Sequence, residues 1–331
     1  MDCYRLRGPG VAGVRAETCD VHAPGPGEIR VKMLAASLNY RDLAIMDRFD
    51  ENRDASLIPL SDGVGEIVEL GDGVRRFALG DRIAGCFYPD WIYGKMNRNQ
   101  GSRSLGGGVT DGVLCTERIF DEQAVVAIPA CLSPIEAATL PCAALTAWNA
   151  LQDVRAGDTI VTQGTGGVAI FALQFAKAAG ARVVALSSSA EKMEKLLKLG
   201  ADDVINYHEQ PRWADAVLQL TGGRGADHIV EVGGASSLPN SLQAIAWNGE
   251  ISLIGTLGHG QINPTPIMVN SAIVRGIRVG SREMFEAMNR RIDAIGLHPV
   301  IDSVMAFSNA PDALRLLQSK QHFGKIVIQI H

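Results

Sequence analysis

Residues Asp158–Ala169 read DTIVTQGTGGVA, and this stretch decides the fold class of the chain. Its first half has the apolar, β-branched pattern of a buried strand, and its second half, Gly-x-Gly-x-x-Ala, precedes an apolar helix that we expect to end near Ala179. A glycine turn between a strand and a helix is typical of dinucleotide-binding folds. In this interpretation Gly164 allows the tight turn, and Gly166 lets the backbone approach a pyrophosphate at the helix N-terminus.

The alternation of strands and helices continues after this turn. We expect further strands at Arg182–Leu186, Asp203–Asn206, His228–Val232 and Glu250–Gly255. We expect the intervening helices to include one that ends at Leu199 and others at Trp213–Leu220 and Ser237–Trp247. Because such alternation requires crossover connections, the sequence predicts an α/β fold with a Rossmann-type, doubly wound parallel sheet.

The segment before the turn has a different pattern, in which short β-rich runs alternate with Pro-Gly and Gly-Asp-Gly turns. These runs are Glu28–Leu34, Gly65–Leu70, Arg82–Phe87, Val113–Ile119 and Ala124–Ile128. They predict a mainly antiparallel β domain. A helix is then expected from Pro134 to Ala150, with Ser133 as its N-cap. The tail returns to β structure at Ile273, continues with a helix at Met284–Ile295 and closes with a strand at Gly324–Ile330.

Composition excludes several classes of function. The 331 residues include 31 Lys and Arg and 36 Asp and Glu, a net charge of −5 with no long block of one sign. This argues against a nucleic-acid or membrane partner. The six cysteines contain no Cys-x-x-Cys pair, so neither a disulfide framework nor a zinc ribbon is indicated. We see no signal peptide or membrane-spanning run, and expect a cytoplasmic protein that acts on a small molecule.

The end of the second predicted strand bears on the choice of dinucleotide. NAD-binding folds place an acidic residue there for the adenosine ribose, but this chain has Ser187-Ser188-Ser189 and then Lys192. Hydroxyl groups and an ammonium ion suit a 2′-phosphate, so we expect NADP rather than NAD. The serine run is also typical of an ordinary helix N-cap, and Glu191 lies nearby.

The motifs taken in order make the chain resemble the medium-chain dehydrogenase/reductase superfamily over nearly its whole length, in its zinc-independent, quinone oxidoreductase-like and alcohol dehydrogenase-like branch. They are Ser37–Asp42, Leu79–Ile83, Ala137–Pro141, Leu145–Trp148, Gln163–Ala169, Leu199–Asp202, Ile205–Tyr207 and Phe323–Lys325. The resemblance implies a GroES-like catalytic domain at 1–126, completed by 268–331, and a Rossmann NADP-binding domain at 127–267. It also implies a homodimer joined through the strand near Ile273–Val279. The β-branched residues of this run are typical of an edge strand that a second copy covers, or of a strand buried inside the sheet.

The resemblance also implies a cofactor site, residue by residue. Asn39 and Thr146 match positions against the nicotinamide, and the pyrophosphate turn matches Gly164, Thr165, Gly166, Gly167 and Val168. The adenosine 2′-phosphate pocket matches Ser188, Lys192 and Tyr207. Residues that edge the cofactor match Val232, Gly233, Ile254, Gly255, Gly280, Ser281 and Lys325. For Gly233 and Gly255, simple turn chemistry is an equally good explanation.

No metal is expected. Zinc-bearing relatives have a cysteine where this chain has Asn39 and a His-Glu pair where it has Ser61-Asp62, and only Cys142 matches a zinc ligand. One thiolate does not make a catalytic zinc site, which needs three protein ligands.

Without a Lewis acid, hydride transfer favours acceptors in which conjugation spreads the charge. We therefore expect NADPH-dependent reduction of a quinone or an enone-type C=C bond. Asn39 is the candidate for orienting nicotinamide or substrate, and Tyr40 is a candidate proton donor, or else a packing residue. The aromatic segment Phe87–Gly108 either binds a planar acceptor or packs a long loop. A metal-free alcohol dehydrogenase and a non-catalytic dinucleotide-binding sensor or structural protein remain alternatives.

Overall fold

The computed structural model describes residues 1–51, 56–255 and 258–331. The chain forms two compact units, one made of Met1–Leu145 with Val279–His331 and the other of Thr146–Arg278. The units change at 145/146 and 278/279, whereas the sequence placed the domain limits at 126/127 and 267/268. The limits of the functional domains stay a prediction.

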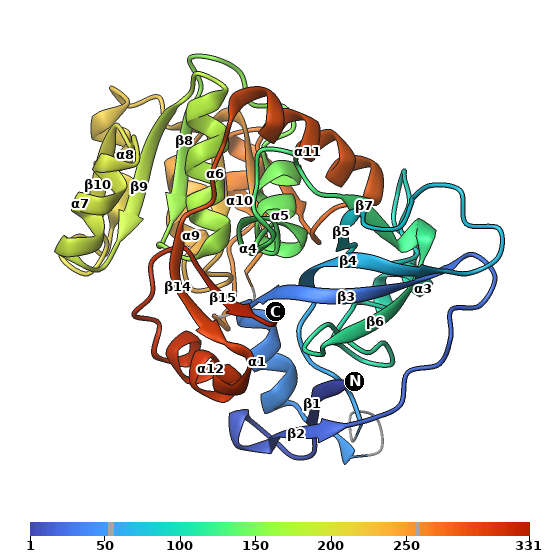
Figure 1. Cartoon of the computed structure of the whole chain (residues 1–331). Coiled ribbons are helices and arrows are strands. Elements are labelled where there is room, and N and C mark those ends of the chain that lie inside the picture. Colours follow the sequence, from blue (N-terminus) through green and yellow to red (C-terminus); the bar gives the residue numbers. More distant parts are fainter. Residues whose placement is uncertain (52–55, 256–257) are drawn as a thin grey trace. The chain divides into compact units, whose positions relative to one another are not determined.

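The second unit is built on a six-stranded parallel sheet, as the glycine turn and the strand–helix alternation predict (Figure 1). The strands are β8 (Thr159–Gln163), β9 (Arg182–Ser187), β10 (Asp203–Asn206), β11 (Ala226–Glu231), β12 (Ile245–Leu253) and β13 (Ile273–Gly276). Their order is β10-β9-β8-β11-β12-β13, so the direction of winding reverses between β8 and β11. Dinucleotides bind at such a switch point, outside the carboxyl ends of the strands.

Helices connect these strands and lie on both faces of the sheet (Figure 1). They are α6 (Gly167–Ala178), α7 (Ala190–Lys198), α8 (Trp213–Leu220), α9 (Leu238–Ala244) and α10 (Thr265–Val269), while α5 (Leu145–Ala150) precedes the first strand, β8. The predicted helix to Trp247 was wrong in its last turn, because Ile245 and Ala246 are buried in β12 and Ile245 pairs with Ala226. A short apolar run does not by itself distinguish a helix from a strand.

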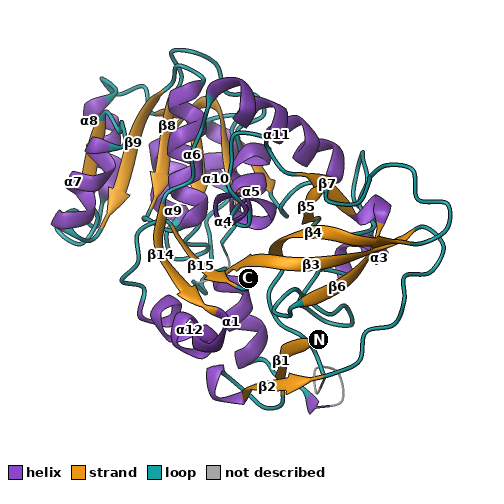
Figure 2. Cartoon of the chain, viewed as in Figure 1, coloured by secondary structure: helices purple, strands orange, loops and turns teal. Residues whose placement is uncertain are grey.

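The first unit contains a seven-stranded, mainly antiparallel sheet, which confirms the β-rich domain (Figure 2). Its strands are β3 (Glu28–Ser37), β4 (Asp62–Leu70), β5 (Arg82–Gly85), β6 (Glu117–Asp121), β7 (Val125–Ala127), β14 (Ile301–Ala306) and β15 (Lys325–Gln329). The order is β14-β15-β3-β4-β5-β7, with β6 also paired to β3, and only β14 and β15 pair in parallel. A separate hairpin joins β1 (Asp2–Leu6) to β2 (Val14–Thr18).

Strand β3 organises the core of this unit. Ile29, Val31 and Met33 are buried at alternate positions, and the intervening Arg30 and Lys32 point the other way. The strand runs three residues beyond the predicted Leu34 because its last residues pair with β4 on one side and β15 on the other. This extension delivers the chain directly to Asn39.

The helices whose bounds the structure describes in the first unit are α1 (Tyr40–Asp47), α3 (Arg98–Ser102), α4 (Pro134–Ala137), α11 (Arg282–Ile295) and α12 (Ala310–Ser319). A π-helical turn lies at Leu140–Ala144, and short 3₁₀ turns lie at Val11–Gly13, Glu122–Ala124 and Phe307–Asn309. The predicted N-cap at Ser133 is confirmed, and Glu136 completes a capping box, since each of the two side chains bonds the other's backbone N–H. The predicted helix from Pro134 is interrupted by the π-helical turn before α5. Among the described residues, no helix is long and apolar enough to cross a membrane.

Candidate cofactor and active site

The glycine turn lies at the carboxyl end of β8. Gly164 has a φ of 79°, a conformation that L side chains rarely adopt. Its N–H donates to Leu186 O at 2.8 Å, which ties the turn to the end of β9. The backbone therefore requires glycine at this position even before any ligand binds.

Gly166 presents a different case. It is the N-cap of α6, with φ −79° and ψ 176°, a backbone conformation open to any residue. A Cβ atom built there meets no other atom within 4 Å, so the protein leaves this space empty. The first N–H groups of α6 have no partner within the helix, and Gly166 has no side chain to cap them. An open cradle at a helix N-terminus fits the pyrophosphate of a dinucleotide.

A buried carboxylate that sequence reasoning missed holds the neighbouring turn. Glu231, at the end of β11, is fully buried and accepts hydrogen bonds from the backbone of Gly233 and Gly234 at 2.8 and 3.0 Å. It also accepts from Ser237, Ser241 and, at 2.7 Å, from Gln163 Nε2. These charge-assisted bonds compensate the buried charge and fix the segment that carries the predicted cofactor residues Val232 and Gly233. The sequence signal that could have indicated this cluster is the pair Ser237 and Ser241, which are four residues apart and both bond to Glu231.

The other strand-end residues have packing or capping roles in the structure. Gly255 lies against the backbone of Val232, where an added Cβ would come within 1.7 Å of Val232 O, and Ile254 N donates to Glu231 O. In the first unit, a Cβ on Gly280 would lie 2.8 Å from Leu145, and Ser281 caps α11 by accepting from Met284 N. These contacts explain the residue types by themselves, so their contact with a cofactor stays a prediction.

The predicted 2′-phosphate residues come together at the ends of β9 and β10. Ser188 is exposed, Lys192 is partly exposed in the first turn of α7, and Tyr207 N donates to Ser187 O at 3.1 Å. Ser189 caps α7 by accepting from Lys192 N, so the capping role considered for the serine run is present as well. Ser188 takes no part in this capping bond. In our interpretation, its exposed hydroxyl group is the one that would bind the 2′-phosphate.

Asn39 and Lys325 form a buried pair in the first unit. Lys325, the first residue of β15, is 3 % exposed, and its Nζ donates to Asn39 Oδ1 at 2.7 Å and to Leu38 O. Asn39 is 8 % exposed and its Nδ2 has no hydrogen-bond partner among the described residues. Leaving a buried donor unsatisfied costs about 1–3 kcal/mol. Such a group is a candidate for binding a ligand.

One acidic group, the carboxyl of Asp42, bonds to the backbone of Asn39. Asp42 Oδ2 accepts from Asn39 N at 2.8 Å, as the Asn-x-x-Asp spacing at a helix start favours. Burial raises the pKa of the Asp42 carboxyl to about 6, although the positive charges of Arg41 and Lys325 oppose the rise. Sequence reasoning did not single out Asp42, whose role depends on the burial that the structure shows.

The residues at the zinc position of metal-bearing relatives do not fit a metal. Ser61 donates to Asp62 Oδ1 at 2.6 Å, and Asp62 Oδ2 accepts from Cys142 N at 3.1 Å. Burial, together with the negative charge of Asp62, raises the pKa of the Cys142 thiol and so disfavours the thiolate that zinc requires. The described residues contain no group of three or more His, Cys, Asp or Glu that could hold a metal ion.

The structure also describes the surroundings of the other sequence candidates. Tyr40 is 44 % exposed, and its ring lies 5.7 Å from Lys320 Nζ. In the aromatic segment, Phe87, Tyr88 and Trp91 are buried and their rings pack edge to face, with centroids 4.7 and 6.2 Å apart. This favours the packing interpretation of that segment. Thr146 is buried in α5 of the second unit, so its position beside Asn39 stays a prediction.

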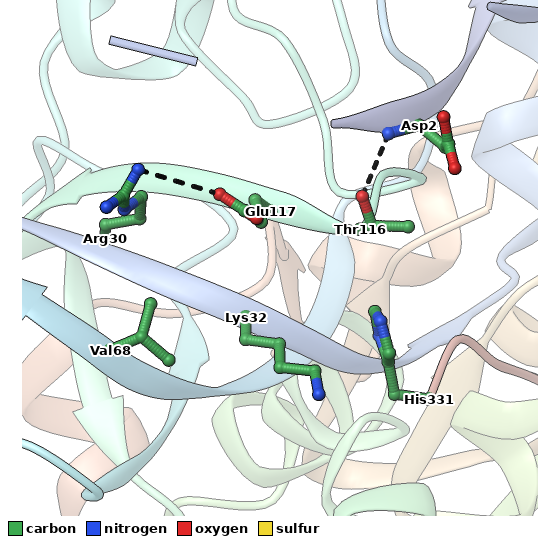
Figure 3. Close-up of a pocket in the computed structure, with 7 residues that line it drawn as sticks. All are labelled: Asp2, Arg30, Lys32, Val68, Thr116, Glu117 and His331. Atoms are coloured by element: carbon green, nitrogen blue, oxygen red, sulfur yellow. Dashed lines mark hydrogen bonds and ion pairs between the residues drawn. The ribbon is translucent and has the colours of Figure 1, made fainter. Parts of the chain in front are cut away.

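A shallow hollow on the first unit contains none of the predicted site residues (Figure 3). It lies over β3, β4 and β6 and is lined by Asp2, Arg30, Lys32, Val68, Thr116, Glu117 and His331. Its side chains partly pair with one another, since Arg30 approaches Glu117 at 4.0 Å. The hollow therefore coincides neither with the Asn39–Lys325 pair nor with the glycine turn.

The chain is similar to known proteins over most of its length. Residues 25–130 match the alcohol dehydrogenase GroES-like domain, and residues 167–294 match the zinc-binding dehydrogenase family. The chain is 41 % identical over 317 residues to a zinc-type alcohol dehydrogenase-like protein of Schizosaccharomyces pombe, covering 92 % of this chain and 91 % of that protein. It is 26 % identical to a quinone oxidoreductase of Sus scrofa, covering 98 % and 95 % of the two chains.

The fold has a close match among solved structures. A crystal structure of an alcohol dehydrogenase-type protein from Sinorhizobium meliloti 1021 superposes with a TM-score of 0.93 at 40 % sequence identity. The match covers 99 % of this chain and 98 % of that one. Both the β-rich part and the parallel sheet are therefore shared with it.

Proposed function

Because the chain belongs to the medium-chain dehydrogenase/reductase superfamily, we propose that it transfers hydride from NADPH to a quinone or an activated C=C bond without zinc. The family makes it an oxidoreductase of the zinc-type alcohol dehydrogenase-like or quinone oxidoreductase-like kind. The single observation that carries the finer proposal is the hydrogen bond from Lys325 Nζ to Asn39 Oδ1.

This bond supports a metal-free reaction on electrostatic grounds. Asn39 stands where zinc-bearing relatives have their first cysteine ligand, and an ammonium ion already occupies the amide oxygen at 2.7 Å. A zinc ion placed against the same amide would be repelled by Lys325, and it would find a neutral Ser61 and a protonated Cys142 as its other neighbours. The donor set does not fit zinc, and no step is assigned to a metal.

A site without a Lewis acid restricts the acceptor. In alcohol dehydrogenases the metal stabilises the charge on oxygen by several kcal/mol. A conjugated acceptor spreads that charge, and hydrogen-bond donors then stabilise it sufficiently. Enones and quinones meet this condition, whereas a simple ketone does not. Water protonates the resulting enolate, so the reaction does not depend on Tyr40.

The second unit supports dinucleotide binding. NADPH, when bound, supplies the hydride. The open space at Gly166 and the N–H groups of α6 would hold the pyrophosphate, and Ser188, Lys192 and Tyr207 would hold the adenosine 2′-phosphate. The Glu231 hydrogen bonds would keep the adjoining turn in place for the cofactor.

The test is NADPH oxidation with a quinone, an enone and a simple ketone, run on protein of known metal content. Turnover of the quinone or the enone by metal-free protein is the expected result. Turnover of only the simple ketone would favour the metal-free alcohol dehydrogenase. NADPH binding without turnover of any acceptor would favour a non-catalytic dinucleotide-binding protein.

A further inference from the structure

The chemistry of Lys325 fixes the orientation of the Asn39 amide. An ammonium group has three donors and no acceptor, so the amide atom that faces it at 2.7 Å must be the oxygen. Lys325 is itself held, because its Nζ also donates to Leu38 O at the end of the preceding segment. The amide therefore cannot exchange its oxygen and nitrogen without breaking a charge-assisted hydrogen bond.

With the amide oxygen bonded to Lys325, the amide nitrogen of Asn39 is the side-chain group that can donate a hydrogen bond to a ligand. Nδ2 is buried, and neither a protein acceptor nor solvent satisfies it in the described structure. The backbone groups of Asn39 are engaged separately, since Asn39 N donates to Asp42 Oδ2 and Asn39 O accepts from Asp42 N. A positive charge on the oxygen side also polarises the amide and strengthens its N–H groups as donors.

We propose that Asn39 Nδ2 donates a hydrogen bond to the carbonyl oxygen of the hydride acceptor, and that Lys325 is the positioning residue that presents this donor. This inference rests on the proposed function and narrows its substrate class to acceptors with a carbonyl conjugated to the reducible bond. It also changes the role predicted for Lys325, because two of its three N–H donors are directed to protein groups.

The donor acts on the charge that hydride transfer creates. As hydride bonds to the β-carbon of an enone, the C=C π bond breaks and its electron pair moves toward the carbonyl oxygen, which gives an enolate. Asn39 Nδ2–H stabilises that oxygen more strongly than it stabilises the neutral ketone. Water then delivers a proton to the α-carbon, so the acceptor gains one hydride and one proton.

A double-mutant cycle tests whether Lys325 acts through Asn39. The variants are Asn39→Ala, Lys325→Met and the double variant, with Lys32→Met as the control because Lys32 is an exposed lysine on β3, outside the cluster. With 2-cyclohexen-1-one, each single variant should lower kcat about tenfold, or about 1.4 kcal/mol, and the double variant should be no slower than Asn39→Ala. NADPH affinity should stay within about twofold of wild type. Losses that multiply in the double variant, or weaker NADPH binding by Lys325→Met with normal kcat, would overturn the positioning role.

A binding measurement separates this inference from the proposed function and from misfolding. Asn39→Asp keeps the partner of Lys325 but replaces the donor with an oxygen. Cyclohexanone, which has the carbonyl but no C=C bond, should bind the wild-type NADPH complex at least about tenfold more tightly than the Asn39→Asp complex in calorimetric titration. Equal binding, or binding to neither, contradicts the inference. If wild type binds cyclohexanone selectively but reduces no acceptor, the proposed function fails and the Asn39 contact stands.

Discussion

Lys325 Nζ and Asn39 Oδ1 lie 2.7 Å apart, although their residues are separated by most of the chain. Strand β15 pairs directly with β3 and brings the lysine to the end of the strand that leads to Asn39. The pair places a fixed cation at the position of the first zinc ligand in metal-bearing relatives. In the zinc-free reaction that we propose, the Lys325 side chain supplies the positive charge there.

A matched pair of glycine substitutions tests the pyrophosphate cradle. Gly166→Ala places a methyl group in a space that the protein leaves empty, so it should weaken NADPH binding at least about tenfold while stability changes little. Gly164→Ala instead forces a left-handed backbone onto alanine and should destabilise the fold by about 1–2 kcal/mol. Fluorescence titration and urea unfolding measure the two effects. Normal NADPH affinity in Gly166→Ala would place the pyrophosphate elsewhere.

The choice between NADP and NAD is expected to depend on the ends of β9 and β10. Lys192→Ala should weaken NADPH binding by about 1.5–3 kcal/mol, the size of a charge-assisted hydrogen bond, and should leave NADH binding unchanged. Lys198→Ala, on the same helix but at its other end, serves as the control. Ser188→Asp should repel the 2′-phosphate and favour NADH. Tighter binding of NADH than of NADPH by wild type would refute the assignment.

Asp42 predicts a pH dependence of stability. Its folded pKa of about 6 lies above the ordinary value of 3.8, so the folded protein holds this proton more tightly than the unfolded chain. Stability from this group is therefore present at low pH and is lost as the pH rises from about 4 to about 6, by about 3 kcal/mol in all. In urea unfolding, the free energy of unfolding of Asp42→Asn should increase relative to that of wild type between pH 4 and pH 7. A pH-independent difference between the two proteins would show that Asp42 is not perturbed in this way.

We propose that the protein is a homodimer joined through β13. This strand is the edge of the parallel sheet in the described chain, and its Ile273 is 55 % exposed. A second copy would cover that edge and extend the sheet. Light scattering should give a dimer mass for wild type, and Ile273→Lys should shift it toward monomer. Val304→Lys, at an exposed position on the edge strand β14 of the other sheet, should remain dimeric. A monomeric wild type at micromolar concentration would end this proposal.

Much of the fold was readable from local patterns. The strand-turn-helix at Gly164 and the later strand–helix units predicted the parallel sheet, and Asp203–Asn206 and Trp213–Leu220 match observed elements at both ends. Patterns failed where tertiary pairing decided the structure. Residues 245–247 read as helix but lie in strand β12. Strand β14 and helix α12 were also not predicted, although α12 buries Ala310, Ala313, Leu314 and Leu317 at helical spacing.

The candidate site was readable residue by residue, but its connections were not. Motif order located Asn39 and Lys325 separately, and nothing in their spacing indicates that they bond to each other. Glu231 and Gln163 were missed because their partners lie on different strands and a helix. The long-range pairs that give these residues their roles exist only after the sheets have formed.

The zinc content of the active protein tests the central claim most directly. We expect protein that oxidises NADPH with an enone or a quinone to contain only substoichiometric zinc by mass spectrometry, and to keep its full rate in the presence of a chelator. Asn39, Ser61 and a protonated Cys142 cannot supply the ligands that zinc needs, and Lys325 opposes its charge. One tightly bound zinc per chain, removed together with the activity, would contradict the account.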